Sequence, residues 1–167
     1  MRRPCIVGVM GGARADAASC ENAYRLGALI ALQGWVLLNG GRNTGIMEAS
    51  ARGAAEAGGL TIGILPDAHT ANASQFVRVA VCTGMGSARN VINVLSSNVI
   101  VACSGGAGTL SEIALALKHG KPVITLGYDL SQCLQFYQGH GSVCTAATPQ
   151  EAIARIQSIL DQVSRVD

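Results

Sequence analysis

Charge and aromatic side chains are scarce in this chain of 167 residues, of which 13% are charged and 4% aromatic. The core must therefore be built mainly from Val, Ile, Leu and Ala. With so few charges on a small domain, much apolar surface has no polar cover, which predicts contacts between subunits of a homo-oligomer. The net charge of +2, without a Lys/Arg cluster or an interleaved aromatic stripe, argues against a nucleic-acid surface.

Long apolar runs are missing as well, since no stretch approaches the roughly 20 residues that cross a bilayer. Arg2 and Arg3 resemble the start of a signal peptide, but Pro4 follows them and the apolar run Cys5–Met10 stops at Gly11. We interpret that run as a first strand. We therefore expect a soluble, cytoplasmic protein with no membrane partner.

The six cysteines show neither C-x-x-C spacing nor a histidine at metal-ligand spacing, so no structural metal is expected. Cys5, Cys82 and Cys103 lie in or at the ends of apolar runs that we expect to form buried strands. A free cysteine behaves there as a small apolar residue. The sequence therefore predicts reduced thiols in the core.

Short apolar runs alternate with segments of helical spacing along the chain. Most runs show no polar alternation, which is typical of strands buried on both faces. The runs are Cys5–Val9, Trp35–Leu38, Thr61–Leu65, Val77–Cys82, Val99–Cys103 and Val123–Leu126. This pattern predicts a single α/β domain over residues 1–167, a doubly wound and mostly parallel sheet of six or seven strands with helices on both faces.

Two segments outside the strands have clear local signals. Thr148–Glu151 forms a capping box with Pro149 at the first helical position, and apolar residues then recur at helical spacing up to Val163. We expect this last helix to pack on the sheet. Pro66–Ser74 is the clearest irregular loop, which we interpret as a surface connection or as a lid over a site.

Four glycine-bearing loops lead from predicted strands into predicted helices, where doubly wound sheets bind ligands. Glycine allows close approach of the backbone, so that N–H groups can point at an anion. The loops are Met10–Ala13, Asn39–Gly45, Thr83–Ser87 and Ser104–Thr109. The candidate ligand-binding residues in and near them are Gly11, Gly12, Gly40, Gly41, Arg42, Asn43, Thr44, Gly45, Met85, Gly86, Arg89, Asn90, Ser104, Gly105, Gly106, Gly108 and Thr109.

Familiar nucleotide and cofactor motifs are absent from these loops. No G-x-x-x-x-G-K-[ST] sequence occurs, which excludes an ATP or GTP P-loop. Gly8 and Gly11 do not fit G-x-G-x-x-G, and Asn39 stands where an acid would hold the ribose of NAD. No lysine has the context of a pyridoxal phosphate site. We therefore expect neither NAD nor pyridoxal phosphate.

Arg89 is the one charged residue in the run Val79–Ser111, which ends directly before Glu112. An Arg in the first turn of a helix opposes the helix dipole and needs an anionic partner, which we expect to be Glu112 or a ligand. Glu112 has two interpretations, because Thr109–Glu112 fits a capping box and a carboxylate can also act in catalysis. Both residues follow strands that we expect to be neighbours, so they could face one crevice.

Other polar residues receive weaker assignments. Thr44 fits an N-cap, and around Arg42 and Asn43 we favour a ligand role for the backbone over the side chains. The histidines His69, His119 and His140 are scattered and form no catalytic set. We interpret the remaining candidates as structural or interfacial, namely Tyr128, Asp129 and Tyr137.

The segments Gly40–Met47 and Ser104–Glu112 resemble the two hallmark loops of the lonely-guy superfamily, often labelled lysine decarboxylase-like. This resemblance spans nearly the whole chain and implies a Rossmann-like sheet, dimers or tetramers, and a site for phosphorylated, nucleotide-like ligands. Enzymes of this superfamily that act on cytokinin riboside monophosphates carry Pro-Gly-Gly-x-Gly-Thr-x-x-Glu and Met-x-x-Arg-Lys. Here Ser104 replaces the proline, Asn90 replaces the lysine, and Met85 lies one residue further from the arginine.

The stretches Thr83–Val94 and Ser104–Ile124 are more similar to the branch that contains molybdenum cofactor carrier proteins. That resemblance implies molybdenum cofactor as cargo, its anion held by backbone N–H groups of Gly40–Gly41 and Gly105–Thr109 with help from Arg89. Molybdenum enzymes or their insertion machinery would then be partners. Two alternatives remain: a nucleoside 5′-monophosphate phosphoribohydrolase that uses Glu112 and Arg89, and a nucleotide-sensing module.

Overall fold

The computed structural model describes residues 3–127, 129–130, 134 and 141–163 and contains one sheet of seven strands. Every pair of neighbouring strands is parallel, in the order β4-β3-β2-β1-β5-β6-β7. The strands are β1 (Ile6–Met10), β2 (Val36–Asn39), β3 (Thr61–Leu65), β4 (Val79–Cys82), β5 (Val99–Ala102), β6 (Val123–Leu126) and β7 (Val143–Ala146). The predicted Rossmann-like α/β fold is confirmed.

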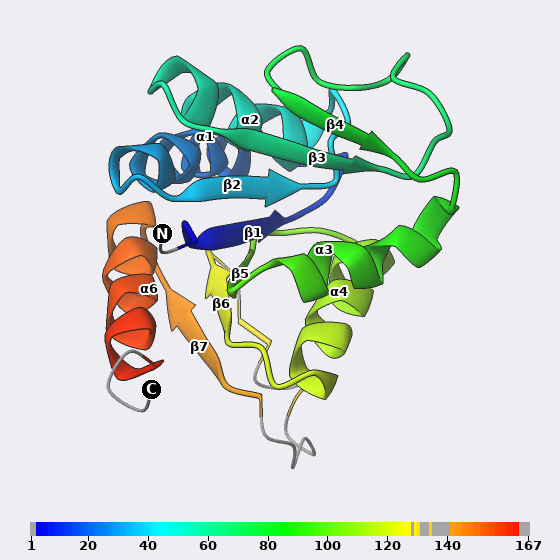
Figure 1. Ribbon diagram of the computed structural model, residues 1–167. Helices are drawn as coiled ribbons and strands as arrows, with labels where there is room; N and C mark the ends of the chain where they lie inside the picture. The colour runs from blue at the N-terminus through cyan, green and yellow to red at the C-terminus, as the bar shows by residue number, and fades with distance from the viewer. Residues whose placement is uncertain (1–2, 128, 131–133, 135–140, 164–167) are drawn as a thin grey trace.

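Helices cover both faces of the sheet (Figure 1). They are α1 (Ala17–Leu32), α2 (Gly45–Glu56), the 3₁₀ helix η1 (Gly86–Arg89), α3 (Asn90–Ser96), α4 (Ala107–Lys118) and α6 (Pro149–Val163). Helix α1 packs against α2 and α6 on one face, and α3 packs beside α4 on the other. Because the helices after β1 and β5 leave to opposite faces, these two adjacent strands form the switch point at which such sheets bind ligands.

The central strands match the sequence prediction, and the edge strands do not. All residues of β2, β5 and β6 are buried, as expected for strands covered on both faces. Strand β4 is exposed at all four positions because it is the last strand of the sheet. Strand β7, which the list of apolar runs omits, lies at the opposite edge and is mostly half-buried.

The cysteines follow the same division between centre and edge. Those within the described residues are free thiols. Burial raises the pKa of the Cys103 thiol to about 12, whereas Cys82 at the end of β4 is exposed, so its predicted place in the core is wrong. Cys5 is half-buried. An edge position, which the sequence does not reveal, accounts for the exposure of Cys82.

Thr148 caps the last helix as predicted, but the Glu151 carboxylate is bonded one residue before the position that a capping box requires. The Glu151 amide donates to the Thr148 hydroxyl at 3.2 Å, and the Ala147 amide donates to the Glu151 carboxylate at 2.9 Å. Helix α6 starts at Pro149 and packs against α1, β6 and β7. No helix among the described residues is both long enough and apolar enough to span a membrane.

The loop Pro66–Ser74 is bonded to the loop that follows β2. The Ser74 amide donates to the Gly41 carbonyl at 2.9 Å, and the Asn43 amide donates to the Asn72 carbonyl at 3.1 Å. An ion pair of 2.8 Å between Arg42 and Asp67 adds a third link. These contacts favour the interpretation of this loop as a surface connection. A lid would have to break them in order to open.

Two helical glycines set the close approach of α1 and α2. A Cβ on Gly27 would collide with the Ser50 carbonyl oxygen, and a Cβ on Gly53 would collide with the Tyr24 carbonyl oxygen. Backbone atoms lie in the way, so rotation of a side chain cannot relieve either collision. This packing positions α2 and, with it, the glycine loop at its N-terminus.

The substitution Gly53→Ala should lower the free energy of unfolding by about 1–3 kcal/mol, because overpacking outweighs the gain of about 1 kcal/mol in helix propensity. Gly108→Ala in α4 is the matched control, since open space surrounds Gly108 and its stability should stay equal or rise. Urea unfolding of both variants measures the difference. Equal stability of the two would contradict this account of the helix contact.

Candidate functional site

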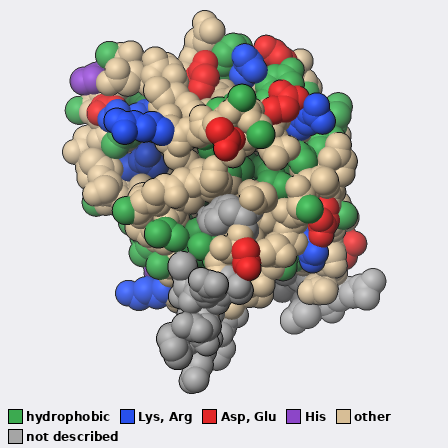
Figure 2. Space-filling model, turned by 180° about the vertical axis from the view of Figure 1, so that it is seen from behind, with side chains coloured by type: hydrophobic (Ala, Val, Ile, Leu, Met, Phe, Trp, Pro, Cys, Tyr) green, Lys and Arg blue, Asp and Glu red, His purple; other side chains and the backbone are tan. Residues whose placement is uncertain are grey.

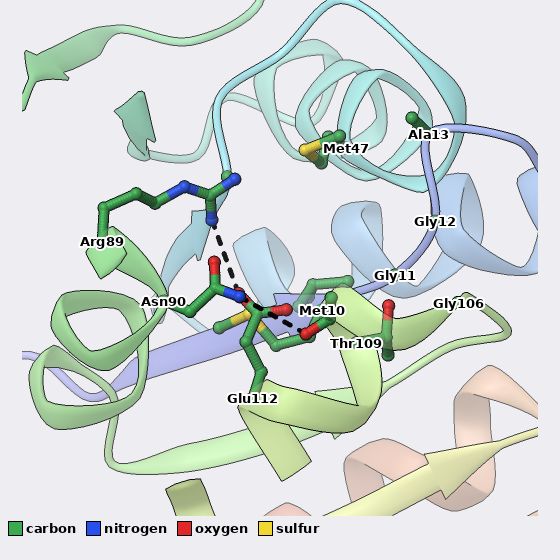
Figure 3. A pocket seen from close by; sticks show the side chains of 13 residues that line it. Met10, Gly11, Gly12, Ala13, Met47, Arg89, Asn90, Gly106, Thr109 and Glu112 are labelled. Atoms are coloured by element: carbon green, nitrogen blue, oxygen red, sulfur yellow. Dashed lines mark hydrogen bonds and ion pairs between the residues drawn. The ribbon is translucent and has the colours of Figure 1, made fainter. Parts of the chain in front are cut away.

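A pocket of about 200 Å³ opens at the carboxyl ends of the central strands. Backbone from the loops that follow β1 and β2 forms one side of the pocket. On the other side, the end of η1 and the start of α3 meet the start of α4 (Figure 3). The lining residues are Val9, Met10, Gly11, Gly12, Ala13, Gly40, Met47, Arg89, Asn90, Gly106, Gly108, Thr109 and Glu112. The structure thus brings together parts of all the predicted loops except Thr83–Ser87.

The start of α4 presents bare backbone to this pocket. The helix begins at Ala107 with Gly106 as an extended N-cap that carries no side chain. Amides in a first helical turn have no acceptor within the helix, and a Cβ on Gly106 or Gly108 would meet only open space. An anion can therefore approach the positive end of the helix dipole without a side chain in between.

The neighbouring glycines have packing roles. A Cβ on Gly105 would collide with the Thr109 hydroxyl and approach the Gly12 amide nitrogen to 2.8 Å. That Gly12 amide donates to the Ser104 carbonyl at 3.0 Å, so it is not free for a ligand. Glycine is required at these positions because the β1 and β5 loops are in direct contact.

The capping-box interpretation of Glu112 is wrong. Since α4 begins at Ala107, Thr109 lies inside the helix and Glu112 lies in its second turn. The carboxylate instead accepts a hydrogen bond from Asn93 Nδ2 at 2.7 Å and faces Arg89 Nη1 at 3.4 Å. Glu112 therefore lies at the pocket wall, where it can act on a ligand.

Arg89 makes few hydrogen bonds for a buried guanidinium. Its side chain is 11% exposed, its Nε has no partner, and its contact with Glu112 is long. The guanidinium lies against Gly40, where a Cβ would come within 2.6 Å of Nη2 and 2.9 Å of Nη1. Gly40 thus makes room for a cation whose donors are largely unused.

The sequence led us to expect that Arg89 and Glu112 follow neighbouring strands, and this expectation is wrong. Strand β4, which precedes Arg89, is at the sheet edge, and three strands separate it from β5. The two residues meet because α3 packs beside α4 on the same face of the sheet. Figure 3 shows both side chains directed toward one another across the pocket wall.

Burial shifts the pKa values of this pair in opposite directions. Desolvation raises the pKa of Glu112, and the hydrogen bond from Asn93 and the charge of Arg89 oppose this rise. Desolvation lowers the pKa of Arg89, with a smaller effect of Arg42 in the same direction. Glu112 and Asp67 counteract that decrease. Both charged forms are therefore poorly solvated in the protein.

Several polar groups of the loop after β2 are hydrogen-bonded within the protein. Asn39 is fully buried, its Oδ1 accepts from the Gly41 amide at 2.8 Å, and its Nδ2 donates to the Met47 carbonyl at 2.9 Å. Gly41 has φ +76°, a conformation that favours glycine. The prediction that the Gly41 amide holds an anion is therefore wrong, because the turn itself occupies that amide.

Other predicted site residues lie outside the pocket. Arg42 is paired with Asp67, the Asn43 amide is bonded to Asn72, and Thr44 is an N-cap without a side-chain hydrogen bond. A Cβ on Gly45 would collide with the Gly12 carbonyl oxygen. These contacts hold the loop after β2 in place. Met85, Gly86, Ser104 and Gly105 also do not line the pocket.

Sequence reasoning missed Asn93, the fully buried partner of Glu112. Its signal is the spacing of four residues from Arg89, which places both on one side of a helical segment. His69 and His119 do not line the pocket, and Asp129 lines a separate cavity beside α6. His140, Tyr128 and Tyr137 lie outside the described residues. Within the described part, no group of His, Cys, Asp or Glu is arranged to hold a metal.

Asn39→Asp should destabilise the protein by about 2 kcal/mol or more at pH 7, because a buried carboxylate replaces the donor to the Met47 carbonyl. Burial should raise the pKa of the new carboxyl, so the deficit should shrink as the pH falls and protonation restores a donor. Urea unfolding of wild type and variant at pH 7 and pH 5 tests this. A deficit of equal size at both pH values would count against it.

The SLOG cluster4 family model matches residues 4–153. The solved molybdenum cofactor binding protein of the phototrophic bacterium Rippkaea orientalis is 54% identical with a TM-score of 0.90, and the alignment covers 96% of this chain and 99% of that one. The molybdenum cofactor carrier protein of Chlamydomonas reinhardtii is 43% identical with a TM-score of 0.87, covering 95% and 99%.

A further relative is an enzyme. The cytokinin riboside 5′-monophosphate phosphoribohydrolase of Mycobacterium tuberculosis is 31% identical over 112 residues, which make up 62% of this chain and 60% of the enzyme. The two cofactor-binding structures have a higher sequence identity to this chain, and their alignments cover more of it. Taken with the family match and the two hallmark loops around the pocket, these similarities mean that the chain belongs to the SLOG cluster4 family of the lonely-guy superfamily.

Proposed function

We propose that this protein binds molybdenum cofactor, a phosphorylated pterin that carries an oxygen-bearing molybdenum, and carries or protects it. The observation behind the proposal is the pairing of two unused donor sets at one pocket. The first helical turn of α4 offers amides that have no acceptor within the helix, with glycine at positions 106 and 108, and the Arg89 guanidinium opposite has one long hydrogen bond. Both favour an anion.

The size of the pocket indicates which part of the ligand it would hold. At about 200 Å³ it is smaller than the roughly 300–1,000 Å³ of typical pockets for whole organic ligands. A phosphate or a molybdenum–oxygen group is small enough for it, and the pterin rings would extend from its mouth. The wall is mostly backbone and neutral side chains, which suits a carrier that binds its cargo without altering it.

The comparisons and the surface support this proposal. Two solved proteins described as molybdenum cofactor binders are similar to this chain over nearly its full length. Exposed apolar residues include Val79 and Val81 on β4 and Leu95 on α3. Figure 2 shows hydrophobic side chains between the charged ones on one face of the protein. We propose a homo-oligomer that delivers the cofactor to molybdenum enzymes or their insertion machinery.

The second candidate is a phosphoribohydrolase, favoured by the retained Arg89 and Glu112 and by the mycobacterial relative. In that role the same amides would hold a 5′-phosphate, and Glu112 would stabilise the sugar or orient water as the base departs. Two residues argue against it: Ser104 replaces the proline of the enzyme motif, and Asn90 replaces the lysine.

Arg89→Ala should weaken binding of molybdate and sulfate about 10- to 150-fold, as expected for loss of charge-assisted hydrogen bonds worth about 1.5–3 kcal/mol. Arg25→Ala is the matched control, because Arg25 pairs with Glu21 on the exposed side of α1. Isothermal titration calorimetry measures both variants. Similar losses in the two would show that Arg89 contributes only general positive charge.

Loading with cofactor released from a molybdenum enzyme under anaerobic conditions separates carrier from hydrolase. The carrier should retain pterin and molybdenum in a fixed ratio on native mass spectrometry and should release no base from AMP or a cytokinin riboside monophosphate. Steady release of base that Glu112→Ala abolishes would overturn the carrier proposal. Absence of both binding and release would overturn both candidates.

A further inference from the structure

The pocket contains an acid where an anion is proposed to bind. Glu112 and Arg89 are the two charged residues in the lining given above. Together they are neutral, so the pocket without ligand offers no net charge to an anion. A ligand that pairs with Arg89 would also meet the repulsion of the Glu112 carboxylate unless that carboxylate changed its state.

The geometry favours such a change. The Glu112 Oε1 atom accepts a short hydrogen bond from Asn93 Nδ2 at 2.7 Å, whereas Arg89 Nη1 is 3.4 Å away. The firm contact is therefore with a neutral amide, and the contact with the cation is near the limit of a hydrogen bond. Arg89 can leave Glu112 at little cost, and Asn93 continues to hold the carboxyl group.

Asn93 is suited to either protonation state of Glu112. Its Oδ1 is buried without a partner, while its Nδ2 donates to the carboxylate. If the amide group rotates by about half a turn, Oδ1 can accept the O–H of a protonated Glu112. This exchange satisfies an oxygen that otherwise lacks a donor.

We propose that an anionic ligand binds this pocket together with one proton, which Glu112 takes up while Arg89 turns from Glu112 to the ligand. This inference rests on the proposed function. The proton comes from bulk water and ends on the Glu112 carboxyl oxygen, and no bond within the ligand changes. Loss of that proton would restore the Arg89–Glu112 pair and favour release of the ligand.

The surrounding charges determine the direction of the pH dependence. Within the described residues that line the pocket, α3 contributes neutral Asn90, the β1 loop and α2 contribute no charge, and η1 contributes Arg89. Arg42 and Asp67 act on Arg89 with opposite sign. Burial already raises the pKa of Glu112, and an adjacent anion raises it further. Binding should therefore strengthen as the pH falls.

The test is calorimetric titration of the full chain with sulfate and with molybdate between pH 6 and pH 8.5, in two buffers of different ionisation enthalpy. Wild type should take up close to one proton per anion. As the pH rises, the affinity of wild type for the anion should fall by up to tenfold per pH unit. This decrease should occur between the pKa of Glu112 in the empty protein and its pKa in the loaded protein.

Glu112→Gln serves as the permanently neutral comparison. Its binding should show no proton uptake and little pH dependence, and at pH 8.5 it should exceed that of wild type. Asn93→Ala should move the pH profile of binding to higher pH, since the carboxylate loses its stabilising donor. A residue that only maintained the fold would not shift this profile.

The outcomes distinguish this inference from the proposed function. Wild type that binds anions without proton uptake, and with the same affinity across the pH range, would overturn the coupling and leave the proposed function standing. Proton uptake that persists in Glu112→Gln would assign it to another group and would also overturn the coupling. Failure of both proteins to bind sulfate or molybdate would overturn the anion site itself.

Discussion

The contact between Arg89 and Glu112 is the interaction around which the pocket is organised. Each group has lost most of its water, and each compensates only part of the desolvation of the other. Such pairs contribute little net stability, because desolvation consumes most of their attraction. Their presence in a pocket therefore points to a use in binding. The surrounding residues make that arrangement possible, since Gly40 leaves space for the guanidinium and Asn93 fixes the carboxylate.

The loops around the pair show why the anion site consists of backbone. Glycines at the start of α4 leave its first amides uncovered, and close contact between the β1 and β5 loops excludes side chains at Gly12 and Gly105. The loop after β2 is held by Asn39 and by Asn72, so the Gly41 and Asn43 amides serve the fold. Only part of the glycine-rich sequence is thus available to a ligand. A site built in this way recognises charge and shape and places few reactive groups beside its cargo.

Some features were predictable from the sequence and others were not. Uniform apolar runs predicted β2, β5 and β6 correctly, because a buried parallel strand requires apolar residues on both faces. The same rule failed for β4, since a run of apolar residues does not reveal whether a helix covers it. The capping box around Glu112 failed because a four-residue motif fits more than one start of a helix. Gly106, three residues before the start of the motif at Thr109, in fact caps α4.

The sequence by itself determined the α/β class, the glycine loops at the carboxyl ends of strands and the two residues with unusual charge, because periodicity and composition record local conformation and burial. Only the tertiary structure decided that Arg89 meets Glu112, although three strands lie between β4 and β5, which precede them. It also decided that Asn93 joins them and that the Gly41 amide is occupied. These contacts depend on how α3 and α4 pack on one face of the sheet. Helix packing brings distant residues together through geometry that no local pattern contains.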